Sequence, residues 1–177
     1  MAQTWRTQRP QSDEFFAYYQ TYISQVPPGD VLTSMETQLA DTLALVRGLP
    51  ESRGDHRYAP GKWTIKEVLG HLSDSERVFA YRLLRVARKD ATPLSGFEQD
   101  DWVRDGRFST RTLADLALEL EHVRRGNLVL LGTLDDEAMM RRGTANNHVI
   151  SARALAYIIA GHERHHVKIL RERYLGG

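Results

Sequence analysis

Hydrophobic residues recur along most of this chain at intervals of three and four positions, which is the period of a helix that buries one face. Strict alternation of apolar and polar residues, the pattern of a half-buried strand, is scarce. Each of four long segments carries a single apolar stripe. We therefore expect long helices over about residues 31–48, 64–88, 110–132 and 151–174, preceded by a short helix near residues 13–24.

Residue types at the predicted helix starts agree with these boundaries. Asp30, Thr64 and Ser151 have side chains that accept hydrogen bonds from the free N–H groups of a first helical turn. Thr64 is followed at the right spacing by Glu67, which predicts a capping box. The stretch GFEQDDWVRDG, residues 96–106, is expected to hold one short helical turn, and Gly143 with Asn146-Asn147 marks a polar connection.

Four helices with one apolar stripe each have a common packing solution, a bundle with the stripes turned inward. The sequence therefore predicts an all-α protein, a four-helix bundle with long connections plus the short N-terminal helix. No linker, repeat or low-complexity tract divides it, so residues 1–177 are expected to form one domain. Long connections are places where functional sites are often built.

Charge and composition narrow the range of partners. The chain has 24 Lys and Arg against 23 Asp and Glu, for a net charge of +1, which does not fit a strongly basic nucleic-acid binder. No apolar run reaches the roughly 18–20 residues that span a membrane, and the N-terminus lacks a signal-peptide core. We expect a cytoplasmic protein that binds neither nucleic acid nor membranes. Cysteine is absent, so this chain supplies no disulfide, thiolate ligand or thiol nucleophile.

The stretch AGHERHH, residues 160–166, carries the most distinctive chemistry. At about 100° per residue, His166 lies only about 40° from His162 on the helix surface, and both fall within the apolar stripe. Two imidazoles in a bundle seam need partners, because an unsatisfied buried polar group costs roughly 1–3 kcal/mol. A bound metal would satisfy both rings. Ordinary hydrogen-bonded core histidines are the alternative.

A third ligand would have to come from a facing helix, and His71 is the candidate. It lies about 100° from the centre of its helix's apolar face, a position that suits either a site open to solvent or a surface histidine. Asp74, one turn later, is either an acceptor that orients a ligand imidazole or an exposed acid. Gly70 and Gly161 precede candidate ligands and indicate close approach of either a ligand or a neighbouring helix. The other histidines are interpreted as surface, loop or flank residues: His56, His122, His148 and His165.

The letters H-E-x-x-H at residues 162–166 also match the signature of zinc metalloproteases, in which the Glu is the general base. Such enzymes take a third ligand downstream, yet only 11 residues follow His166, and Glu172 among them lies on the same predicted helix. A zincin-type metalloprotease is therefore the least favoured reading. In a bundle, Glu163 would be a solvated acid or would form an ion pair with a neighbouring Arg, an interaction typically worth only about 0–1 kcal/mol.

Four longer motifs carry a resemblance to a known family: YYQTYISQVPPGD, YAPGKWTIKEVLGHLSDSERVFAYR, TPLSGFEQDDWV and ALAYIIAGHERHHVKILRERYL. Through most of its length the chain resembles the DinB family of the DinB/YfiT-like superfamily, damage-inducible proteins unrelated to the DNA polymerase that shares the name. The resemblance implies a four-helix bundle with a divalent metal held by three histidines. At the matching positions these are His71, His162 and His166.

The resemblance also implies an activity. Three imidazoles leave open coordination positions, as in catalytic metal sites. Members of the family include hydrolases and enzymes that use low-molecular-weight thiols, such as bacillithiol S-transferases and mycothiol-dependent isomerases. We expect a metal-dependent hydrolase or thiol S-transferase that binds Zn or Ni, with Fe or Mn as alternatives, and acts on a small molecule. Glu163 and Asp74 are the candidate catalytic residues. The protein could form a homodimer. The alternative function is that of a non-catalytic metal-binding module of the stress response.

Overall fold

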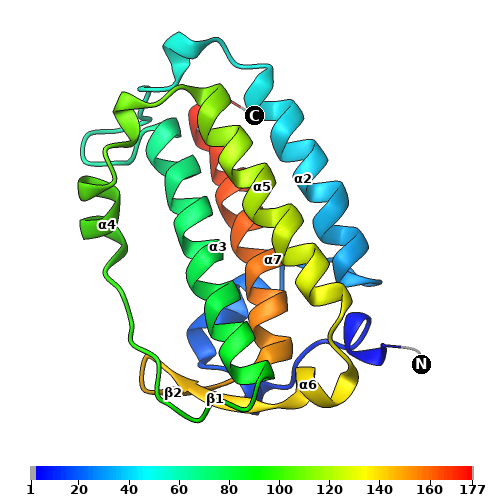
Figure 1. The fold of residues 1–177 in the computed structure, drawn as a ribbon. Helices are drawn as coiled ribbons and strands as arrows, with labels where there is room; N and C mark the ends of the chain where they lie inside the picture. Colours follow the sequence, from blue (N-terminus) through cyan, green and yellow to red (C-terminus); the bar gives the residue numbers. More distant parts are fainter. Residues whose placement is uncertain (1–2, 177) are drawn as a thin grey trace.

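A computed structural model describes residues 3–176 of the chain, and four long helices form its body (Figure 1). All four coincide with the helices that the hydrophobic periodicity predicts, which confirms the expected all-α four-helix bundle. Their bounds are α2 (Val31–Arg47), α3 (Ile65–Ala87), α5 (Leu113–Gly132) and α7 (Ala152–Ile169).

The caps that the sequence predicts are present at three of these helices. The Asp30 side chain accepts hydrogen bonds from the N–H groups of Leu32 and Thr33. Thr64 and Glu67 form both bonds of the capping box at the start of α3. Ser151 caps α7 by accepting from the third residue beyond it. These local bonds satisfy N–H groups that have no partner within a helix, and they fix where each helix begins.

The helices pack in a ring in which α2 and α3 each contact both α5 and α7. In Figure 1, α2 and α7 run upward while α3 and α5 run downward. Because the neighbours α3 and α5 are parallel, the chain between them has to travel back along the whole bundle. Residues 88–112 make this return and include the short helix α4 (Gln99–Asp105), which confirms the helical turn expected there.

Two hydrophobic clusters fill the interior, one toward each end of the bundle. The first includes Phe79 and Tyr157 and extends to Trp5 of the N-terminal segment. The second includes Leu69 and Leu116. Glu76, Arg124 and Glu163, all buried, carry charge into the same interior.

The ends of the expected elements differ in two places. The N-terminal helix expected at 13–24 is reduced to α1 (Gln20–Ile23), preceded by the 3₁₀ turns Thr4–Arg6, Ser12–Glu14 and Ala17–Tyr19. Glu14 explains this, because it is buried against Ser151 and Arg153 and draws the segment across the start of α7. The last turn of the fourth predicted helix is a π-helical turn, Leu170–Tyr174.

The connection between α5 and α7 contains structure that the periodicity does not reveal. After the short helix α6 (Asp136–Met140), strands β1 (Arg142–Ala145) and β2 (His148–Ser151) form an antiparallel hairpin. Its two-residue turn is Asn146-Asn147, with φ angles of 49° and 64°. Positive φ at both positions is the geometry that matches the twist of a tight hairpin, and Asn tolerates it. Four-residue strands are too short for their alternation to stand out.

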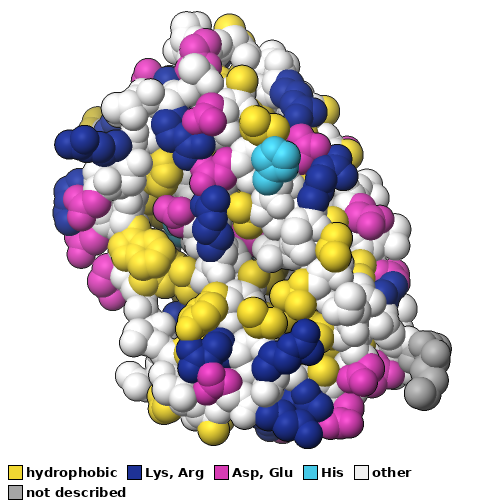
Figure 2. All heavy atoms as spheres, viewed as in Figure 1, with side chains coloured by type: hydrophobic (Ala, Val, Ile, Leu, Met, Phe, Trp, Pro, Cys, Tyr) yellow, Lys and Arg dark blue, Asp and Glu magenta, His cyan; other side chains and the backbone are white. Residues whose placement is uncertain are grey.

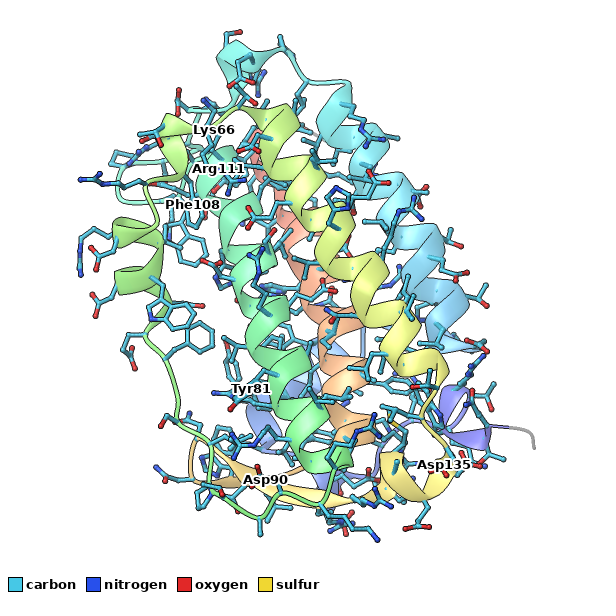
Figure 3. The ribbon with its side chains drawn as sticks, in the orientation of Figure 1. Lys66, Tyr81, Asp90, Phe108, Arg111 and Asp135 are labelled. Carbon is cyan, nitrogen blue, oxygen red and sulfur yellow. The ribbon has the colours of Figure 1, made fainter. Side chains whose placement is uncertain are left out.

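Gly161 allows α1 to lie directly on α7. A Cβ atom at Gly161 would stand 2.1 Å from the carbonyl oxygen of Tyr22, which belongs to the backbone and has little freedom to move. The glycine before His71 is explained in the same way, since a Cβ at Gly70 would stand 2.2 Å from the Phe108 ring. Figure 3 shows Phe108 beside α3. Of the two explanations for these glycines, the structure supports close packing of neighbouring protein segments rather than of a ligand.

We predict that Gly161→Ala lowers the free energy of unfolding by about 1–3 kcal/mol, because the added methyl group forces α1 away from α7. Gly126→Ala is the matched control: it also lies within a long helix, but a Cβ there meets nothing within 4 Å. The control should raise stability by about 0.5–1 kcal/mol. Urea unfolding followed by circular dichroism measures both. Equal effects of the two substitutions would contradict the close approach.

Candidate metal site

The structure brings His71, His162 and His166 together, from α3 and from two successive turns of α7. One ring nitrogen from each lies within 4.8 Å of the others. The Nε2 atoms of His71 and His162 are 3.0 Å apart. Among the described residues, no fourth His, Asp or Glu joins this group.

His71 is buried more deeply than its helix position indicates, with only 3% of its surface exposed. Because α3 packs against α5 on one side and α7 on the other, a large part of its surface is buried, including the position of His71. Trp63, just before the helix, covers the histidine further, with ring centres 4.7 Å apart. The position of a residue around its own helix cannot predict burial by residues outside that helix.

Aromatic side chains surround the three imidazoles. The rings of Tyr22 and Phe79 lie nearly perpendicular to the His162 ring, with ring centres 5.2 and 5.5 Å away. Trp63 stacks near His166 at 6.3 Å. These rings restrict the orientations that the imidazoles can adopt, so the nitrogens stay directed at one another.

Burial keeps the three imidazoles uncharged at neutral pH. It lowers the pKa of His71 to about 4. Burial, followed by the neighbouring imidazoles, lowers the pKa of His162 and of His166 well below the usual value. A metal ion binds the neutral form of His, so no proton has to be displaced from these rings before a metal can bind.

The donor set fits a divalent transition metal. Ligands of imidazole nitrogen suit Zn, Ni, Fe and Cu, and three of them converge here. Apart from His162, Ser75 is the only described residue whose side chain hydrogen-bonds the His71 ring. Its Oγ lies 3.3 Å from Nδ1 and 3.4 Å from Nε2 of His71. Its hydroxyl can hold the His71 ring in one orientation while the other nitrogen binds a metal.

Two cavities reach the three histidines from different sides. A cavity of about 220 Å³ is lined by His71 and His162 together with Ser75 and Phe79. A second, of about 330 Å³, is lined by Trp63 and His166. Both cavities share three lining residues: Tyr18, Tyr22 and Gln99. The cluster is therefore accessible to small molecules even though its members are largely buried.

Tyr18 and Tyr22 form a pair between the cavities that sequence reasoning missed as part of the site. Their hydroxyl oxygens are 3.0 Å apart. Burial, together with Tyr18, raises the pKa of Tyr22, so its hydroxyl stays protonated and can donate a hydrogen bond at neutral pH. The only signal in the sequence is the aromatic run around YYQTY, which is equally typical of core packing.

Glu163 has surroundings unlike those expected from the sequence. Only 2% of it is exposed, so the expectation of a solvated acid was wrong. One carboxylate oxygen accepts a hydrogen bond of 2.6 Å from the Thr42 hydroxyl, and the other lies 2.8 Å from Nη1 of Arg124. The ion pair anticipated as an alternative is therefore present, but it is buried. Glu163 does not line either cavity beside the histidines.

Asp74 also lies away from the imidazoles. Its carboxylate faces Arg77 at 3.4 Å, and Arg77 in turn pairs with Glu119 of α5. Within residues 3–176 Asp74 makes no hydrogen bond to any of the three clustered histidines, so the expected orienting contact is absent and Ser75 occupies that place. Burial raises the pKa of Asp74. A catalytic role for Asp74 or Glu163 stays a prediction.

The remaining histidines lie where the sequence placed them. His56, His122 and His148 are exposed. His165 is partly buried on the flank of α7, where its Nδ1 lies 3.3 Å from the Gln25 amide, and it lines the second cavity.

Comparison with solved structures supports the same architecture. YfiT from Bacillus subtilis, described as a probable metal-dependent hydrolase with an unusual four-helix bundle topology, matches with a TM-score of 0.68 and 19% identity over 93% of each chain. The mycothiol-dependent maleylpyruvate isomerase matches with a TM-score of 0.65 and 16% identity. That match covers 83% of this chain and 62% of the isomerase. A protein from Streptococcus pneumoniae matches with a TM-score of 0.63 and 11% identity, over 88% of this chain and 98% of that one.

At these identities the structures establish the fold alone. Among curated protein sequences, none matches this chain. No helix of the described residues has the length and apolar character needed to cross a bilayer. A sequence model of the DinB superfamily, however, matches residues 34–170. This range contains all three clustered histidines and all four long helices, apart from the first three residues of α2. The chain belongs to the DinB superfamily.

Proposed function

We propose that the chain is a metal-dependent enzyme that transforms a small molecule at His71, His162 and His166. One observation carries the proposal: three neutral imidazoles converge within 4.8 Å at the meeting point of two cavities. A structural metal site is usually closed by a fourth protein ligand, whereas a catalytic site keeps a position open. The described residues supply three ligands and leave the cluster accessible.

The three histidines would hold a divalent metal, with Zn or Ni expected first and Fe or Mn as alternatives. The chemistry that such a metal supplies is Lewis acidity, which lowers the pKa of a water or thiol and polarises a substrate oxygen. The chain's own groups then have separate tasks. Ser75 holds the His71 ring, and the rings of Trp63 and Phe79 keep bulk water away. The protonated hydroxyl of Tyr22 can donate to negative charge that develops on a substrate.

Two reactions suit this arrangement, hydrolysis and the transfer of a low-molecular-weight thiol of the bacillithiol type. The similar structures are described in one case as a probable metal-dependent hydrolase and in the other as mycothiol-dependent. Because this chain has no Cys, a thiol would have to be an external cosubstrate. If the reaction is thiol transfer, the second substrate is a small soluble thiol. We expect the protein to act in the cytoplasm.

The other functions are less well supported. A non-catalytic stress-response module would not need the two cavities. A zincin-type protease would need Glu163 as its base, yet both carboxylate oxygens of Glu163 are engaged by Thr42 and Arg124. The near-balanced charge gives no support for nucleic-acid binding.

We predict that His71→Ala abolishes stoichiometric binding of Zn²⁺ and Ni²⁺. Losing a hydrogen bond that supports a ligand typically weakens metal affinity by roughly 10–100-fold. Removing a ligand itself should weaken metal affinity by more than this. Isothermal titration calorimetry and elemental analysis measure this, and His122→Ala, an exposed histidine on α5, is the control. Activity is assayed on the same metal-loaded preparations, with p-nitrophenyl acetate for hydrolysis and with bacillithiol plus monochlorobimane for thiol transfer.

Turnover of one of these substrates by wild type and His122→Ala, lost in His71→Ala, is the expected result. Fully metal-loaded protein that turns over neither substrate would favour the non-catalytic module. Unchanged metal affinity in His71→Ala would remove the three-histidine site itself.

In the metal-free protein, stability should depend on pH through the same histidines. Burial holds the pKa of His71 near 4, against about 6.5 in an unfolded chain. Between these values the unfolded chain binds a proton that the folded chain does not, so the free energy of unfolding falls as pH drops from 6.5 to 4. The His71 contribution is fully present above pH 6.5 and is of the order of 3 kcal/mol. Urea unfolding of wild type and His71→Gln across this range measures it; parallel pH curves would contradict the prediction.

Glu163→Gln should lower stability but retain metal binding and activity. The amide loses the charge that faces Arg124, while Arg124 keeps Glu76, at 2.7 and 2.8 Å. We expect a loss of about 1–3 kcal/mol. Arg124→Met leaves two buried carboxylates without a cation and should cost more, about 3–5 kcal/mol. Thermal and urea unfolding rank the two variants. Activity lost in Glu163→Gln with metal and stability unchanged would instead assign Glu163 a catalytic role.

A further inference from the structure

A larger cavity, of about 620 Å³, opens on the outer side of α3, facing the 92–97 connection and α4. Its apolar walls are the rings of Tyr81, Phe97 and Trp102. Figure 2 shows a hydrophobic patch on this face with Lys and Arg side chains beside it, and Figure 3 places Tyr81 on the lower half of α3. A volume in this range is typical of pockets that bind small organic molecules.

Three arginines line the cavity, and they differ in how their charge is balanced. Arg77 pairs with Asp74 and Glu119. Arg85 pairs with Asp90. Arg82 forms no ion pair within the described part of the chain, although it is only 3% exposed. The acceptor at its guanidinium is neutral, the Ser95 carbonyl oxygen at 2.5 Å.

A buried guanidinium without a counter-charge is energetically costly, because burial removes the water that would solvate the charge. An anion that entered the cavity would remove part of this cost. The planar fork of a guanidinium matches one carboxylate group particularly well. The other two arginines are already neutralised by acids, so the cavity is suited to a ligand with a single negative charge.

We propose that this cavity binds a small carboxylic acid with an aromatic or similarly flat apolar body. The carboxylate would pair with Arg82, and the body would lie against Tyr81, Phe97 and Trp102. Arg82 already stands 6.0 Å from the centre of the Phe97 ring, so the charged and apolar parts of the site adjoin each other.

The site is separate from the metal site but adjacent to it. Phe97 lines both this cavity and the cavity that contains His71 and His162. None of the three clustered histidines lines the Arg82 cavity. Binding here therefore does not depend on the proposed function, and the loss of a metal ligand should leave it intact.

The test uses indole-3-acetate as the probe and indole-3-acetamide as its neutral counterpart of nearly the same shape. Calorimetry gives the affinities, and the indole N–H signal of Trp102 in ¹H–¹⁵N spectra reports the location. We expect the acid to bind at least about tenfold more tightly than the amide, equivalent to about 1.4 kcal/mol. Arg82→Gln should remove this preference, and Arg88→Gln, an exposed arginine just beyond α3, should retain it.

Two further variants separate a lost site from a lost fold. Arg82→Lys keeps the charge without the fork and should retain part of the preference for the acid. Trp102→Ala, at a side chain 44% exposed, should weaken the acid and the amide alike. His71→Ala should bind the acid as wild type does. Equal binding of acid and amide, no binding of the acid at millimolar concentration, an unchanged preference in Arg82→Gln, or loss of binding in His71→Ala would each overturn the proposal.

Discussion

The buried guanidinium of Arg124 connects all four helices of the bundle. Its guanidinium is fully buried and lies between two carboxylates, with Glu76 contributing both oxygens at 2.7 and 2.8 Å and Glu163 one at 2.8 Å. Thr42 donates to Glu163, and Asn127 donates to Glu76. These residues come from α2, α3, α5 and α7, so all four helices meet at one polar cluster. Because burying an unpaired charge is so costly, few alternative alignments of the helices would be tolerated.

This cluster also sets the direction in which the candidate ligands point. Glu163 follows His162 directly, and neighbouring side chains on a helix diverge by about 100°. With Glu163 held toward Thr42 and Arg124, α7 is rotated so that His162 faces α3 and meets His71 at 3.0 Å. The letters that resemble a protease motif thus divide their tasks: the histidines form the candidate metal site, and the glutamate secures the helix that carries them.

The cover of the site depends on a different constraint, the close contact between α1 and α7. Gly161 lets the backbone at Tyr22 approach α7, and this brings Tyr18 and Tyr22 over the histidines. The connection before α3 adds Trp63 from another side. The connection after α3 adds Phe97, which separates the cavity at the histidines from the cavity at Arg82. The long connections between the helices therefore build the surroundings of the chemistry, while the helices provide its fixed points.

The four helices, most of their caps and the pair His162 and His166 could be predicted from the amino-acid sequence, because they depend on local periodicity and on hydrogen bonds between residues a few positions apart. His71 was identified through the family resemblance, since its helix position alone was ambiguous. The Asn146-Asn147 hairpin was missed because its four-residue strands are too short for their alternation to stand out. Tertiary packing is what buries Glu163 and brings Ser75 rather than Asp74 to His71. It also places Tyr22 beside the histidines and leaves Arg82 without a carboxylate partner among residues 3–176. Each of these depends on which distant side chains come within a few ångströms, and that is set by how the helices and their connections pack, which no spacing along the chain encodes.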